Sequence, residues 1–230
     1  MAGMEKLTPE RLAKYFDHTL LRANATVEDF EHFCAESRRY GFAMVAINSA
    51  PVARCKALLS GTSVRVGAAI GFPLGQTTPA AKLYETQDAL DHGADEIDYV
   101  VNLTELQAGN HAFIAAEMRS IVELCRSKGA TSKVIYENCY LTDAEKSTLC
   151  DISLDVGPDF IKTSTGFGTG GATMSDIKLM LGAVAGRIQV KAAGGIRDLD
   201  TALQLIDMGV MRIGSTASVH IVEALREKNG

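Results

Sequence analysis

A chain of 230 residues that is 47% hydrophobic and 22% charged has the length of one large globular domain. Its net charge of −5, without any basic stripe in the sequence, argues against nucleic acid as a partner. No run reaches the ~18 apolar residues of a membrane span, and the N-terminus has no apolar signal core. The five cysteines are odd in number and form no CxxC pair, so we expect reduced thiols in a cytoplasmic protein.

Short apolar runs alternate with helical stretches along the whole chain. The predicted strands are Tyr15–Thr19, Ala43–Asn48, Val64–Ile70, Glu96–Asn102, Lys133–Asn138, Phe160–Ser164, Ile188–Ala193 and Met211–Ser215. The clearest helices between them are Thr26–Tyr40, Pro79–His92, Asn110–Lys128, Thr142–Val156, Ser175–Ala185 and Leu199–Met208. Thr26 and Thr142 each stand three residues before an acid, as in a capping box.

This alternation predicts an α/β protein with a single (β/α)8 TIM barrel domain over residues 1–230. A doubly wound open sheet is the alternative, although no predicted strand is followed by GxGxxG. In a barrel, the apolar residues of each strand pack under the helices and the alternate residues face the axis. We therefore expect polar side chains to converge inside, toward the C-terminal mouth. They are Asp17, Arg65, Asp98, Lys162, Lys191 and Arg212.

Lys162 and Lys191 lie near the ends of adjacent predicted strands, each before a turn rich in polar residues or glycine. Desolvation disfavours an ammonium, and two neighbouring ammonium groups depress each other's pKa. A lysine with a depressed pKa is the nucleophile that Schiff-base chemistry requires. Asp98 is interpreted either as an ion-pair partner of Lys162 or Arg65, or as a proton shuttle, and the two roles are compatible.

Two turns near the C-terminus predict a phosphate site. Gly194–Arg197 follows the seventh predicted strand, and Gly214–Ser218 follows the eighth and opens the last helix. Phosphate sites in these barrels recur after strands 7 and 8, where backbone N–H groups and a helix N-terminus meet the anion. The five histidines form neither HxH nor HExxH, and no cysteine pair lies near them, so we expect no metal.

At these residues the chain resembles the deoxyribose-phosphate aldolase family, a family of class I aldolases. The resemblance runs from about Tyr15 to Ile221, and the segment around Lys162 together with the segment around Lys191 is the most specific part. The matching segments are Asp17–Leu21, Ile70–Gly75, Gly93–Asp98 with Asn102, Lys133–Glu137, Phe160–Phe167, Lys191–Arg197 and Arg212–Gly214.

The resemblance implies a (β/α)8 barrel that needs no cofactor and reversibly cleaves 2-deoxy-D-ribose 5-phosphate to acetaldehyde and D-glyceraldehyde 3-phosphate. It also implies a homodimer or a higher homo-oligomer. Lys162 matches the Schiff-base lysine, Lys191 the second lysine, and Asp98 the acid–base aspartate. The residues assigned to substrate binding are Asp17, Thr165, Gly166, Gly194, Gly195, Arg197, Gly214, Ser215 and Thr216.

Three positions depart from the pattern of the family. Ala217 stands in the last turn where a hydroxyl is usual, which lowers the expected affinity for phosphate. Ala46 replaces a common cysteine, and Ser49 replaces a proline. Two other functions remain open: another lysine-dependent aldolase or transaldolase on the same barrel, and a phosphate-binding barrel without catalysis.

Overall fold

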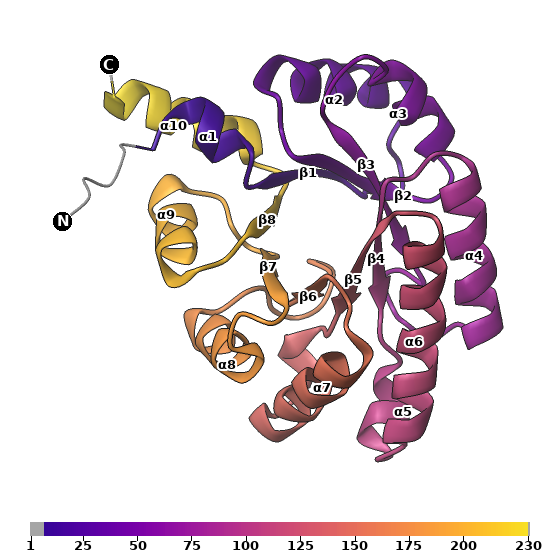
Figure 1. Cartoon of the computed structure of the whole chain (residues 1–230). Coiled ribbons are helices and arrows are strands. Elements are labelled where there is room, and N and C mark those ends of the chain that lie inside the picture. The colour runs from indigo at the N-terminus through magenta and orange to yellow at the C-terminus, as the bar shows by residue number, and fades with distance from the viewer. Residues whose placement is uncertain (1–6, 230) are drawn as a thin grey trace.

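The computed structural model describes residues 7–229, and its centre is a closed ring of parallel strands (Figure 1). The ring closes between the first and last strands, where Asp17 pairs in register with Gly214. This closure confirms the predicted (β/α)8 barrel and excludes an open sheet. The strands are β1 (Phe16–Leu20), β2 (Met44–Asn48), β3 (Arg65–Ile70), β4 (Glu96–Val100), β5 (Thr131–Ile135), β6 (Phe160–Lys162), β7 (Gln189–Ala193) and β8 (Arg212–Ser215).

Helices cover the outside of the ring (Figure 1). They are α1 (Pro9–Ala13), α2 (Val27–Tyr40), α3 (Val52–Leu58), α4 (Pro79–Asp91), α5 (Leu103–Gln107), α6 (His111–Ser127), α7 (Asp143–Val156), α8 (Met174–Val184), α9 (Leu199–Met208) and α10 (Ser218–Asn229), with a 3-10 turn η1 (Asn138–Tyr140). Thr26 and Thr142 form the two predicted capping boxes, which satisfy backbone N–H groups at the starts of α2 and α7. Near the termini, α1 packs beside α10.

Strands β4 and β5 end two and three residues earlier than predicted, for local reasons. Strand β4 stops before Asn102, because the Asn102 side chain caps α5 by accepting a hydrogen bond from the Glu105 N–H (3.2 Å). Strand β5 stops before Glu137, which has a left-handed backbone (φ 57°) that a strand residue cannot adopt. The short helices α1, α3 and α5 were not singled out by the sequence pattern, since each has too few turns to show a period.

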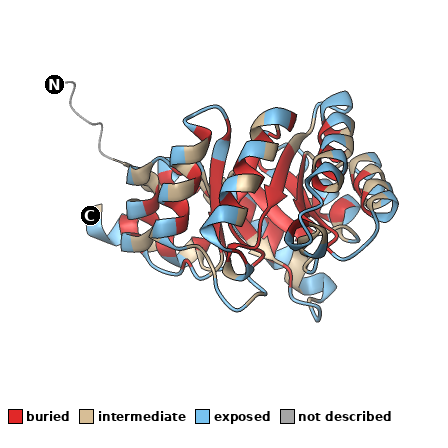
Figure 2. Cartoon of the chain, turned by 90° about the horizontal axis from the view of Figure 1, so that it is seen from below, coloured by how far each residue is buried: buried red, intermediate tan, exposed pale blue. Residues whose placement is uncertain are grey.

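The two faces of the strands have opposite characters. The outward face is apolar: Ile97, Val134, Ile161 and Val190 are fully buried beneath the helices. Figure 2 shows the strands buried and the outer faces of the helices exposed. The inward face carries charged side chains, which include Asp17, Asp98 and Lys191. The barrel axis is therefore lined by charged side chains that are shielded from water.

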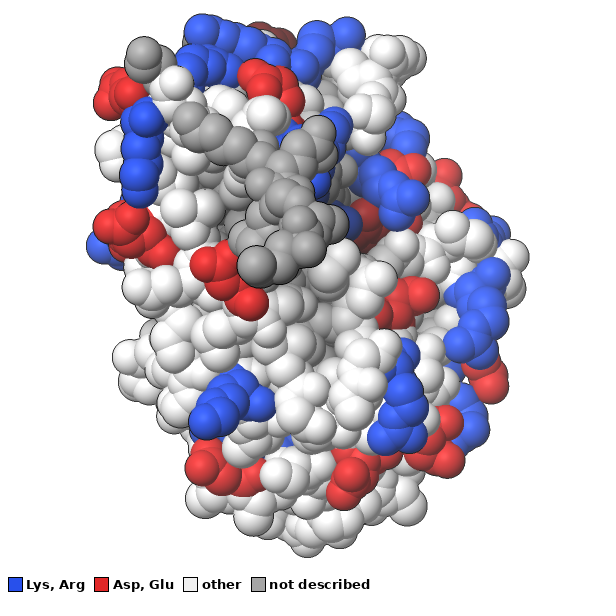
Figure 3. Space-filling view, turned by 60° about the vertical axis from the view of Figure 1, so that its left-hand side comes forward, with Lys and Arg blue, Asp and Glu red and all other residues white. Residues whose placement is uncertain are grey.

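Charge on the surface is arranged differently. On the face shown in Figure 3, Lys and Arg side chains lie interspersed with Asp and Glu among uncharged residues. Surface ion pairs such as Lys56–Asp95 and Arg119–Asp155 are solvated and contribute little to stability. Within residues 7–229, no helix has the length and apolar character to cross a membrane.

Candidate active site

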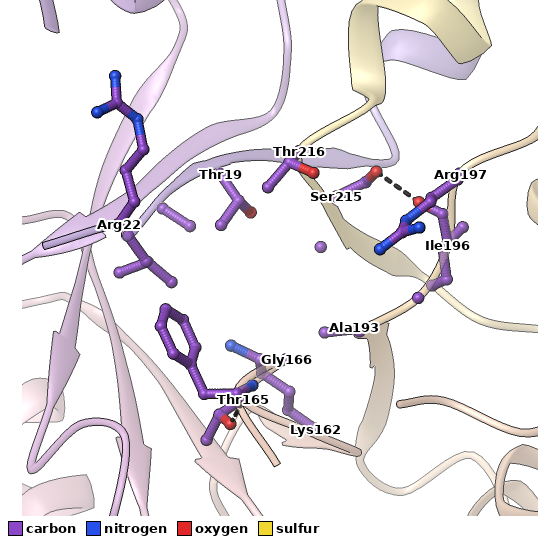
Figure 4. A pocket seen from close by; sticks show the side chains of 16 residues that line it. Thr19, Arg22, Lys162, Thr165, Gly166, Ala193, Ile196, Arg197, Ser215 and Thr216 are labelled. Atoms are coloured by element: carbon purple, nitrogen blue, oxygen red, sulfur yellow. Dashed lines mark hydrogen bonds between the residues drawn. The ribbon is translucent and has the colours of Figure 1, made fainter. Parts of the chain in front are cut away.

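A cavity of about 290 Å3 opens where Lys162 ends β6 and the loops after β7 and β8 meet. Figure 4 shows the Lys162 amine pointing into this cavity. Most of the residues predicted from the sequence line its wall. They are Lys162, Thr165, Gly166, Gly194, Gly195, Arg197, Gly214, Ser215 and Thr216.

Asp98 and Lys191 lie directly behind Lys162. The Lys162 amine donates a hydrogen bond to Asp98 Oδ2 (2.9 Å), and the Lys191 amine donates to the same oxygen (2.6 Å). Lys162 and Lys191 are partners in the register of β6 and β7, so both amines reach the same depth of the barrel. The structure thus brings together the three residues that the sequence assigned to catalysis.

Asp17 lies below the cavity, although we expected it to contact substrate. It is fully buried near the start of β1, where it forms ion pairs with Lys191 and with Arg212. Burial would raise the pKa of the Asp17 carboxyl, but the cations Arg212, Lys191 and Lys133 outweigh that effect and lower it. Asp17 therefore holds Lys191 in place from beneath and does not line the cavity.

Lys133 is a charged residue of the interior that the sequence analysis missed. Its amine lies 2.7 Å from Asp98 Oδ1 and also pairs with Glu96. Burial lowers the pKa of the Lys133 ammonium, but Asp98, Glu96 and Asp17 together raise it above its ordinary value. The signal was present: Lys133 and Glu137 alternate with Val134 and Tyr136, the same parity that marked the other strands.

The pKa of the Lys162 ammonium is lowered from 10.5 to about 8. The largest cause is burial, which removes the hydration of the ammonium; Asp98 opposes the shift, and Lys191 and Lys133 add to it. The sequence analysis named both desolvation and the neighbouring Lys191, and in the structure burial is the larger of the two causes. At pH 7, a pKa of about 8 leaves about one amine in ten neutral, against about one in three thousand at the ordinary value.

Asp98 stays ionised under the same conditions. Burial would raise the pKa of this carboxyl, but the ammonium groups of Lys133, Lys162 and Lys191 hold it well below its ordinary value. A carboxylate that accepts three charge-assisted hydrogen bonds is fixed in orientation. Asp98 can therefore accept protons from the Lys162 amine while the ammonium groups of Lys133 and Lys191 stabilise the negative charge of its carboxylate.

The far wall of the cavity presents backbone donors. Gly194 and Gly195 both have left-handed backbones (φ 86° and 79°), and such consecutive turns aim N–H groups into a concavity that suits anions. Arg197 is exposed, and its guanidinium points toward the cavity in Figure 4. Several lining N–H groups have no acceptor among residues 7–229. They belong to Gly166, Gly194, Gly195, Ile196, Arg197 and Thr216.

Two predicted substrate hydroxyls are already engaged with the protein. The Ser215 hydroxyl donates to the Ile196 carbonyl (2.7 Å) and accepts from the Ala217 N–H (2.9 Å), which ties the turn after β8 to the turn after β7. The Thr165 hydroxyl donates to Glu137 and accepts from the Phe167 N–H (3.0 Å). Both hydroxyls shape the loops, so the donors that face the cavity come mainly from the backbone.

Glu137 is a second residue that the sequence analysis missed. The residue is 3% exposed, and its carboxylate accepts hydrogen bonds from both the N–H (3.2 Å) and the hydroxyl of Thr165. Its left-handed backbone costs on the order of 1 kcal/mol for a residue other than glycine. The conformation is kept because it turns the carboxylate toward the loop after β6. Glu137 thereby fixes the loop that carries Gly166.

No cluster of three or more His, Cys, Asp or Glu side chains within residues 7–229 is arranged to hold a metal ion. His18, the neighbour of Asp17 on β1, stacks on Phe33 and lies close to Phe42. Burial lowers the pKa of its imidazole to about 4, so it is neutral at pH 7. His18 is therefore a packed residue of the outer core.

The comparisons with known proteins give a consistent result. Residues 11–214 match the model of the DeoC/LacD family aldolases. A deoxyribose-phosphate aldolase of Bacteroides thetaiotaomicron is 54% identical over 96% of this chain and 93% of that protein, and one of Lactobacillus acidophilus is 47% identical over the same shares. The solved tetrameric deoxyribose phosphate aldolase of Aeropyrum pernix superposes with a TM-score of 0.89 at 33% identity, covering 96% of this chain and 93% of that one.

Proposed function

Since the chain belongs to the DeoC/LacD family of aldolases, we propose that it reversibly cleaves 2-deoxy-D-ribose 5-phosphate to acetaldehyde and D-glyceraldehyde 3-phosphate through an imine on Lys162. One observation carries the proposal. A buried amine whose pKa is about 8 faces a cavity whose other wall offers unengaged N–H donors. The first group suits a nucleophile for an aldehyde, and the second suits a phosphate.

The first step is formation of the imine. The neutral Lys162 amine attacks the C1 aldehyde of the open-chain sugar, and the resulting carbinolamine loses water to give an iminium. Asp98, 2.9 Å from the amine, is the base that takes the proton released by nitrogen, and Lys191 lies 2.6 Å from the same carboxylate oxygen to return a proton to the leaving hydroxyl.

The second step breaks the C2–C3 bond. The iminium draws the bonding electrons toward nitrogen while the C3 hydroxyl loses its proton, which releases D-glyceraldehyde 3-phosphate and leaves an enamine on Lys162. Protonation of the enamine at C2 and addition of water then give acetaldehyde and the free amine. The iminium itself is the electron sink, so this route calls for no metal ion or other cofactor.

The phosphate of the sugar binds at the turns after β7 and β8. The N–H groups of Gly194, Gly195 and Thr216 surround the anion, Gly166 contributes from the loop after β6, and Arg197 supplies a positive charge. The start of α10 adds the positive end of a helix dipole. Because most donors are backbone groups, Ala217 should weaken phosphate binding only modestly.

We also propose a homo-oligomer that works in the cytoplasm. The relative from Aeropyrum pernix is described as a tetramer, which supports assembly of this chain with copies of itself. The five cysteines are free thiols, and four of them are buried, a pattern that suits a reducing compartment.

Trapping the imine tests the proposed function. Borohydride reduction in the presence of acetaldehyde should add one ethyl group per chain, at the peptide that contains Lys162, as read by intact and peptide mass. Lys162→Ala should abolish the label, while Lys128→Ala, which removes an exposed lysine paired with Asp91, should keep it. A label that persists in Lys162→Ala would show that another amine forms the imine.

A further inference from the structure

The barrel interior holds balanced numbers of opposite charges beneath the cavity. Among residues 7–229, the carboxylates that face the axis there are those of Asp17, Glu96 and Asp98. The buried or nearly buried cations that pair with them are Lys133, Lys191 and Arg212. Lys162 is a fourth cation if it is protonated. With Lys162 neutral, three negative charges face three positive ones.

The pairing is shared around the ring, so no carboxylate is reserved for Lys162. Asp17 pairs with Arg212 and Lys191, and Glu96 pairs with Lys133 and Arg212 (3.2 Å). Asp98 accepts from Lys133 at one oxygen, and from Lys162 and Lys191 at the other. The charge that Asp98 would offer to a protonated Lys162 is therefore already divided between two other ammonium groups.

We propose that Lys133 and Glu96, which lie below the cavity and out of reach of substrate, set the charge balance of the barrel interior so that Lys162 is the amine left neutral. They are positioning residues, because they act on the reaction only through Asp98 and Lys162. The inference deepens the proposed function and rests on Lys162 as the imine-forming residue.

The physical basis is the cost of net charge in a dry interior. Lys133 and Glu96 are fully buried, so their charges are poorly screened by water. The groups that face Lys162 are Asp98 from β4, Lys133 from β5 and Lys191 from β7, with Asp17, Glu96 and Arg212 one contact further away. Arg65 also pairs with Glu96, but its side chain is 56% exposed, so water screens its charge.

Opposite changes of charge should move Lys162 in opposite directions. Lys133→Met keeps the apolar stem and deletes one positive charge, so Asp98 attracts the Lys162 proton more strongly. Glu96→Gln keeps the shape and deletes one negative charge, so protonation of Lys162 becomes less favourable. A purely structural role would give lower activity in both variants without this reversal of sign.

The measurement is the pH dependence of imine formation with acetaldehyde. Imine formed in a fixed short interval at each pH is trapped by borohydride at one common pH and counted by intact mass. The midpoint should rise by about one pH unit in Lys133→Met and fall by about one unit in Glu96→Gln. At pH 7, the amount trapped should fall about tenfold in the first and rise about fivefold in the second. The double variant should return close to the midpoint of the wild type.

Lys82→Met is the matched control. Lys82 is also fully buried and pairs with Glu117 (2.8 Å), but it lies on α4, outside the ring of strands. Its loss should lower stability and leave the midpoint unchanged. Midpoints that stay fixed, or move the same way in both variants, overturn the inference while wild-type trapping at Lys162 still supports the aldolase. If Lys133→Met does not fold, as judged by circular dichroism, Glu96→Gln decides alone: a midpoint that stays or rises overturns the inference.

Discussion

The two ends of the cavity are built in different ways. At the inner end, Lys162, Asp98 and Lys191 are side chains on adjacent or nearby strands, held by hydrogen bonds of 2.9 Å or less. At the outer end, Gly194 and Gly195 offer backbone N–H groups on turns. The inner end acts through buried charged side chains and contacts every substrate. The outer end acts through backbone N–H groups and binds only substrates that carry an anionic group at that position.

This difference predicts that substitutions at the two ends should have different kinetic effects. A lost charge at the inner end should reduce the rate with all sugars and change the dependence on pH. A change at the outer end should alter KM for phosphorylated sugars and leave unphosphorylated ones nearly untouched.

The largest effect is expected for Lys191→Met. The variant keeps the apolar stem and deletes the ammonium that shares Asp98 with Lys162, so the pKa of Lys162 should rise and its neutral fraction should fall. At pH 7, kcat/KM should drop at least ~10²-fold with deoxyribose 5-phosphate and with deoxyribose alike. Steady-state assays from neutral to alkaline pH should show part of the loss recovered at high pH. Near-normal activity at pH 7 would leave Lys191 without a catalytic role.

A smaller and more selective effect is expected for Gly195→Asp. No atom lies within 4 Å of a Cβ added at Gly195, so the side chain has room and would place a carboxylate beside the phosphate. KM for deoxyribose 5-phosphate should rise about tenfold or more, while KM for deoxyribose should change little. Gly195→Asn is the matched control, because asparagine has the same shape, tolerates a left-handed backbone and carries no charge. Equal losses with both sugars would show that the turn is structural.

The sequence predicted the inner end better than the outer end. Side chains alternate regularly between the two faces of a strand, so the sequence alone predicts that Asp98, Lys162 and Lys191 face the axis. Lys133 obeys the same rule, although the sequence analysis did not single it out: its amine also reaches Asp98 on the axis. The glycines after β7 and β8 were recognised only from their place in the barrel. Glycine allows many backbone angles, so the sequence does not determine the direction of their N–H groups.

Contacts between loops were beyond the reach of the sequence pattern. Thr165 and Ser215 were assigned to substrate, but Glu137 and the Ile196 carbonyl take up their hydroxyls. These partners lie 28 and 19 residues away, so no local period links them. Asp17 has the predicted parity but sits one layer too deep to reach the cavity, because depth depends on the stagger of strands around the ring.

Burial keeps a useful share of Lys162 neutral near pH 7. The most direct test is the pH profile of kcat/KM for unphosphorylated deoxyribose, a substrate with no phosphate to titrate. With a pKa of about 8, kcat/KM should rise about tenfold per pH unit below pH 8 and level off above it, because only the neutral amine attacks. A profile that keeps rising toward pH 10.5 would contradict the account, since Lys162 would then ionise like an ordinary exposed lysine.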